Sequence, residues 1–143
     1  MGIPRAGAPA LGFAVACLCS GTPALAETPT ISVELNKLEP NGGDCRAYLV
    51  VNNESKTGLK AFKLDLVLFQ NDGVIGRRFA VDLAPLRPSK RSVKLFDIDG
   101  TSCDSVGSFL INDVLECDAE SGEISDCLAA ISASSLSQVK LTK

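Results

Sequence analysis

From Thr30 onward the chain alternates apolar and polar residues in short runs, and this alternation constrains the fold more than any other feature. A period of two places every second side chain on the same face of an extended strand. Runs of this kind recur at 31–35, 47–51, 62–68, 79–83, 93–95, 109–115 and 135–142. Turn residues separate them, such as Asn71-Asp72-Gly73, because Gly, Asn and Asp tolerate the backbone angles of tight turns. The sequence therefore predicts an all-β domain.

The number and spacing of these runs narrow the architecture. About seven short strands, with turns every 8–12 residues, are typical of an antiparallel β-sandwich of the immunoglobulin-like kind. Two prolines in the segment 85–88 cannot donate to a central ladder, so we expect a crossing loop there. A helix is predicted only at about 126–133, where Ser125 would cap it and Cys127 and Ile131 would share one face.

The first 26 residues form a predicted export signal. Arg5 is their only charge, an apolar run follows at 8–18, and a small-x-small pattern ends at Ala26. The apolar run is well short of the roughly 20 residues that span a bilayer. A lipoprotein lipidated at Cys17 is an alternative to cleavage after Ala26. We therefore expect a periplasmic or secreted protein without a membrane span.

The remaining residues, 27–143, are few enough for one domain, and they contain Cys45, Cys103, Cys117 and Cys127. An even number of cysteines in an exported domain favours disulfides. A zinc site typically needs cysteine pairs separated by about two to four residues, or histidine ligands. These four cysteines have no such spacing, and the chain has no histidine. The sequence thus predicts two disulfides and neither a metal nor a cofactor.

Between Cys45 and Ile98 the strands and turns follow a recognisable order. A strand leads to Asn52-Asn53-Glu54-Ser55, then to the run Phe62–Phe69, then to Asn-Asp-Gly, and then to Leu83–Pro88 before a further strand. This order resembles the small exported immunoglobulin-like domains of bacteria, in particular the FxLYD-type domains. The resemblance implies an interaction or structural module without a catalytic site, and it implies no particular site residues.

The strand directions of such a sandwich decide which cysteines can meet. Cys45 begins its strand, and Cys103 follows a later strand that runs the opposite way, so both lie at the same end. Cys117 ends the next strand at the other end, more than a strand length from Cys45, whereas the Cα atoms of a disulfide lie within about 7 Å. We therefore expect Cys45–Cys103 and Cys117–Cys127 bridges.

The segment Lys94–Thr101 resembles the first motif of the haloacid-dehalogenase phosphatases, an apolar strand followed by D-x-D-G-T. The resemblance implies a nucleophile at Asp97, a general acid/base at Asp99 and a bound Mg²⁺. In that family, however, the motif begins a larger α/β domain, whereas only residues 102–143 follow here. A strand that ends in an Asp-Gly turn is the simpler interpretation. A phosphohydrolase is therefore the alternative, and the main prediction is that the protein is not an enzyme.

Composition excludes further classes of function. The 14 Lys and Arg residues stand against 17 Asp and Glu residues, with a net charge of −3, which argues against general nucleic-acid binding. The absence of histidine removes Ser-His-Asp and Cys-His nucleophiles. Acidic residues cluster at 97–104 and 113–126; a solvated surface is the expected interpretation, and weak calcium binding is the alternative.

Four apolar side chains face away from the predicted core: Tyr48, Val50, Val67 and Phe69. If their strands are neighbours or face each other, these residues form an exposed patch for a partner. The alternative is that other segments cover them. The sequence thus predicts an exported, non-enzymatic binding or accessory module. It names neither the protein partner nor the oligomeric state.

Overall fold

The computed structural model describes residues 1–9, 21 and 30–143. Most of the apolar run of the predicted signal lies outside these residues. The predicted cleavage site after Ala26 and the alternative lipidation site, Cys17, lie outside them as well.

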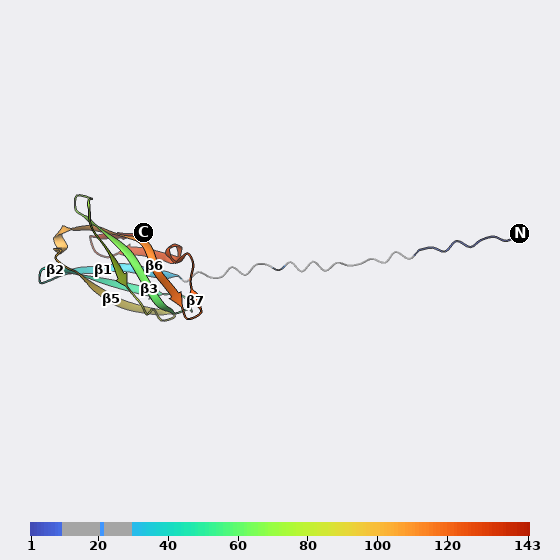
Figure 1. Ribbon diagram of the computed structural model, residues 1–143, viewed down its shortest axis with the longest axis horizontal. Coiled ribbons are helices and arrows are strands. Elements are labelled where there is room, and N and C mark those ends of the chain that lie inside the picture. The colour runs from blue at the N-terminus through green and yellow to red at the C-terminus, as the bar shows by residue number, and fades with distance from the viewer. Residues whose placement is uncertain (10–20, 22–29) are drawn as a thin grey trace.

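Two β-sheets pack face to face around one hydrophobic core, so the predicted sandwich is confirmed (Figure 1). Sheet A has the order β5-β2-β1-β8, with β5 Lys90–Ile98, β2 Asp44–Asn53, β1 Ile31–Asn41 and β8 Ile131–Ser135. Sheet B has the order β4-β3-β6-β7, with β4 Ile75–Asp82, β3 Leu59–Gln70, β6 Val106–Ala119 and β7 Gly122–Glu123. A ninth strand, β9 Lys140–Thr142, also pairs with β6. The described part of the chain thus has nine strands, against the seven or so expected from the sequence.

The period-two alternation explains the core. On β3 the residues Phe62, Leu64, Leu66 and Leu68 point inward, each with at most 2% of its surface exposed. On β1 and β2, which belong to the other sheet, alternate apolar residues are buried in the same core. Burying one large apolar side chain contributes about 1.5–3 kcal/mol relative to leaving it in water, so the apolar parity of each strand fixes which face turns inward.

The last two strands run parallel to their neighbours, which the prediction of an antiparallel sandwich did not include. β8 pairs parallel with β1, and β9 pairs parallel with β6, so the chain crosses from sheet A to sheet B between them. The Ser135 hydroxyl fixes this crossing, because it donates to the Val139 carbonyl (2.6 Å) and accepts from the Ser137 amide (3.1 Å). Alternation looks the same in parallel and antiparallel strands, so the sequence could not reveal the direction.

The predicted helix at 126–133 is wrong over its second half. Only one turn forms, α1 Cys127–Ala130, and Ile131 begins β8 instead. Ile131 is 2% exposed and pairs with Ile31 of β1, so burial in the sheet overrides the helical spacing. Among the described residues, no helix has the length and apolar character needed to cross a membrane.

Two disulfides fasten the sandwich, and their pairings are those expected from the strand directions. Cys45 at the start of β2 is joined to Cys103 in the 3₁₀ turn η1 Cys103–Ser105, with Cα atoms 4.9 Å apart. Cys117 of β6 is joined to Cys127 of α1, with Cα atoms 6.5 Å apart. Disulfides of this kind are typical of proteins that fold in oxidising compartments.

Candidate functional site

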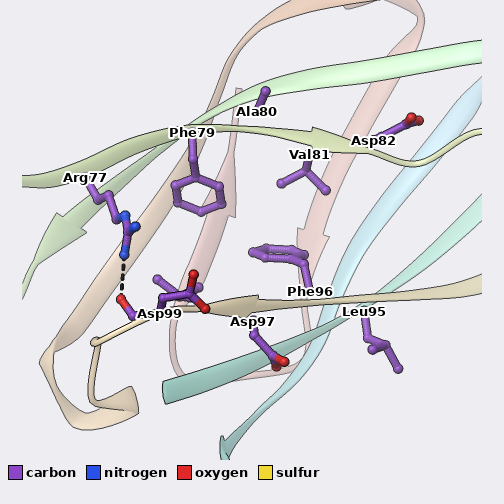
Figure 2. A pocket seen from close by; sticks show the side chains of 10 residues that line it. Arg77, Phe79, Ala80, Val81, Asp82, Leu95, Phe96, Asp97 and Asp99 are labelled. Atoms are coloured by element: carbon purple, nitrogen blue, oxygen red, sulfur yellow. Dashed lines mark hydrogen bonds between the residues drawn. The ribbon is translucent and has the colours of Figure 1, made fainter. Parts of the chain in front are cut away.

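A cleft opens between β4 and β5, at the side of the sandwich where both sheets end (Figure 2). In the described part of the chain, β4 pairs only with β3 and β5 pairs only with β2, so both are edge strands. The cleft has a volume of about 300 Å³. Its lining comes from Arg77 and Phe79–Asp82 on β4 and from Leu95–Asp99 on and just after β5.

Two aromatic rings face each other in the cleft, whose lining also includes charged residues. Phe79 of β4 and Phe96 of β5 point toward each other from the two sheets (Figure 2), with ring centroids 5.6 Å apart and planes tilted by 54°. Both rings are half-buried, whereas Val81 and Ile98 beside them are buried. An apolar side chain that enters from the open edge would therefore meet aromatic surface.

Two cationic side chains donate hydrogen bonds to backbone oxygens beside the cleft. The Arg77 guanidinium of β4 donates to the backbone oxygen of Asp99, just after β5, at 2.5 Å (Figure 2). The Lys94 ammonium donates to the carbonyls of Ala84 and Pro85 at 3.4 and 3.5 Å. These contacts link β5 and the turn after it to β4 and to the loop that follows β4.

The carboxylates of Asp97 and Asp99, the two acids of the phosphatase-like motif, do not form a pair in the cleft. Asp97 points away from it (Figure 2), and its carboxylate accepts from both Nε and Nη2 of Arg46, at 2.7 and 2.9 Å. Arg46 is its register partner on β2. This guanidinium, with a smaller contribution from Asn41, holds the pKa of Asp97 below its usual value. Asp99 accepts the Arg77 bond through its backbone. No group of three acidic or cysteine side chains with the geometry of a metal site occurs in the described residues.

The structure does not bring Tyr48, Val50, Val67 and Phe69 into one patch. β2 belongs to sheet A and β3 to sheet B, so residues of outward parity on these strands lie on opposite faces of the sandwich. Val50 and Val67 are also nearly covered, at 9% and 6% exposed. The Tyr48 hydroxyl donates to the Glu39 carboxylate at 2.7 Å, and this bond is the main cause of the lowered pKa of Glu39.

Two exposed apolar side chains lie instead side by side on the edge strand β5, where the sequence did not predict a patch. The sequence marked Val93 and Leu95 only as the apolar positions of a strand. In the structure they face solvent, 63% and 54% exposed, while Phe96 and Ile98 point toward the core. Val93 and Leu95 are the register partners of Val50 and Tyr48. We call these four residues the β5 strip.

Comparisons with known proteins give a likeness in fold. Neither the protein-family models nor the curated proteins yield a match to this chain. The solved structure of IrmA from Escherichia coli is similar, with a TM-score of 0.54 and 10% sequence identity. The likeness covers 73% of this chain and 91% of that chain. At this level of identity it supports the two-sheet fold alone.

Proposed function

We propose that this protein is a non-enzymatic binding module, exported to the periplasm or beyond, and that it binds a protein partner along β5. The observation that carries the proposal is the edge position of β5 together with the exposure of Val93 (63%) and Leu95 (54%). The two disulfides and the predicted signal support export. The resemblance to FxLYD-type domains agrees with a role in binding.

An edge strand is suited to this task because it presents backbone N–H and C=O groups to a strand laid beside it. Side chains then add selectivity, and here the β5 strip lies on one side of β5 while the cleft with Phe79 and Phe96 lies on the other. The alternative, a Mg²⁺-dependent phosphohydrolase using Asp97 and Asp99, receives less support. Its proposed nucleophile has both carboxylate oxygens occupied by Arg46.

The test is capture of native envelope or secreted proteins on the immobilised, folded protein. Val93→Lys/Leu95→Lys places two charges on the binding edge, so we expect retained proteins to be lost. Val74→Lys/Ile75→Lys is the matched control, because Val74 and Ile75 are equally exposed (59% and 62%) but lie at the β3–β4 turn. Retention by the edge variant, equal loss in the control, or a failure of the unaltered protein to capture any protein, a native copy of this chain included, would contradict the proposal.

A further inference from the structure

We infer that the occupant of the β5 edge is a second copy of this chain, which pairs antiparallel with β5 about a two-fold axis at Lys94. The inference rests on the proposed function, because it takes β5 as the binding edge. A two-fold axis makes the same surface serve both copies, so β5 must be complementary to itself when reversed. The order of residues along β5 meets this requirement.

The complementarity appears when β5 is read in both directions from Lys94. Val93 then lies opposite Leu95 of the partner subunit, and Arg91 lies opposite Asp97 of the partner subunit. Both pairs occur twice because of the symmetry. Residues directly opposite each other in an antiparallel pair share a face, so all four pairs lie on the solvent face that carries the β5 strip. Cross-strand apolar pairs and pairs of opposite charge are the contacts that stabilise a sheet.

Neighbouring registers lose this match. With the axis at Val93, Arg91 lies opposite an apolar Leu95, and Asp97 has Ser89 opposite it. With the axis at Leu95, Arg91 lies opposite Asp99, beyond the end of β5, but Val93 lies opposite the carboxylate of Asp97. A shift that keeps the same faces together must move by such steps. Of these three registers, the one centred on Lys94 leaves no apolar residue of β5 opposite a charge on the solvent face.

The charges also explain why the exposed edge would select its own copy. Lys90, Arg91 and Lys94 deter indiscriminate pairing, as basic residues on edge strands do, whereas Asp97 at the other end offers an anion to an incoming Arg91. Asp97 already binds Arg46 but keeps 32% of its side chain exposed, so a second guanidinium can approach it. At the axis, Lys94 lies opposite Lys94 of the partner subunit, and the repulsion between the two ammonium groups is unfavourable. Its ammonium is turned toward the Ala84 and Pro85 carbonyls of its own copy.

Pairing at β5 would also bring the partner subunit to the mouth of the cleft. Phe96, which is half-buried at the cleft, would lie opposite Ser92 of the partner subunit in this register. The two four-stranded A sheets would join into one continuous sheet through their β5 edges. The second copy would thus pair the β5 edge and place a strand beside Phe96, whereas β4 would remain an edge strand.

The experiment is sedimentation equilibrium of the purified mature protein across micromolar concentrations. We expect a concentration-dependent dimer. Arg91→Glu and Asp97→Lys, each alone, place like charges opposite each other twice, so each raises the dimer dissociation constant roughly tenfold or more. In an equimolar mixture of these two variants, the introduced glutamate faces the introduced lysine, and the unaltered Arg91 and Asp97 face each other in the other half. Mixing therefore restores dimerisation.

Lys56→Glu is the matched control, because it makes the same charge change at an exposed residue of the β2–β3 loop and leaves the dimer unchanged. Thermal unfolding of each variant shows that it is folded. A protein that stays monomeric overturns the self-pairing, as does a dimer that is unaffected by Arg91→Glu or is not restored by mixing. If the monomeric protein still loses captured partners through Val93→Lys/Leu95→Lys, the proposed function stands and only the identity of the partner is wrong.

Discussion

At the scale of single residues, the outer face of sheet B contains a buried carboxylate. Asp65 on β3 is 3% exposed, and a buried charge is tolerated only where partners compensate for the lost water. Arg78 of β4 donates to both of its oxygens at 2.8 Å, and the Asn112 amide of β6 donates at 2.7 Å. Arg78, followed by Asn112, holds the pKa of Asp65 below its usual value. The ionised form is therefore part of the folded state.

Replacing Asp65 by asparagine keeps the shape but removes the charge that Arg78 binds, so Asp65→Asn should lower the melting temperature at pH 7. Because the folded state has the lower pKa, this stabilisation is fully present above the unfolded pKa and is lost as pH falls through the folded pKa. The difference from the unaltered protein should therefore narrow below about pH 4. Thermal unfolding followed by circular dichroism at pH 7 and at lower pH measures it.

Asp97→Asn is the control for Asp65→Asn. Asp97 also binds an arginine, but about a third of its side chain (32%) is exposed, and exposed ion pairs contribute little to stability. We expect a smaller fall in melting temperature at pH 7. A larger fall for Asp97→Asn, or a difference for Asp65→Asn that grows as pH falls, would contradict the account of Asp65.

The sequence predicted the burial of apolar residues but not that of polar ones. The alternation predicted the inward side chains of β3, such as Phe62 and Leu64, because burial there follows local parity. It could not predict the buried polar residues. Asn53 lies in a turn motif, yet it is fully buried and donates to the carbonyls of Thr57 and Arg87. Arg87 comes from a loop 34 residues away, so the sequence near Asn53 holds no signal for this contact.

At the scale of elements, strands were predictable but their neighbours were not. β5 carries apolar residues on both parities, so alternation alone could not decide that Phe96 and Ile98 point inward and Val93 and Leu95 outward. The position of β5 at an edge depends on the order of strands in sheet A, which arises from contacts distant in sequence. For that reason the sequence placed the candidate patch on β2 and β3 rather than on β2 and β5.

The two disulfides join elements at very different sequence separations, 58 residues for Cys45–Cys103 and 10 for Cys117–Cys127. Closing these loops in the unfolded chain corresponds to about 4 and just under 3 kcal/mol. The Cys45→Ala/Cys103→Ala double variant should therefore melt clearly below the Cys117→Ala/Cys127→Ala variant. Differential scanning calorimetry of both variants measures the order. Equal melting temperatures would contradict this order. They would show that the Cys117–Cys127 bridge, through the native contacts around α1, stabilises the fold as much as the bridge that closes the longer loop.

At the scale of the whole molecule, the sandwich follows from the regular spacing of short alternating strands, and the bridges follow from the alternation of strand direction. Both arguments use features that recur along the domain from residue 30 onward, which is why the sequence could reveal them. The cleft between β4 and β5 could not be predicted in this way. It exists because β4 and β5, edges of different sheets, lie on the same side of the core, and that placement depends on how the two sheets pack.

Export through the predicted signal would leave a defined mature chain. If the protein leaves the cytoplasm through its predicted signal, peptidase cleavage after Ala26 makes Glu27 the first residue. The mature chain then keeps only the four cysteines that the structure pairs as Cys45–Cys103 and Cys117–Cys127. Each bridge removes two hydrogens, so intact mass spectrometry should find a mass four hydrogens below that of reduced residues 27–143. A mature chain that begins with a lipidated Cys17, or one with four free thiols, would contradict both the compartment and the role given to the bridges.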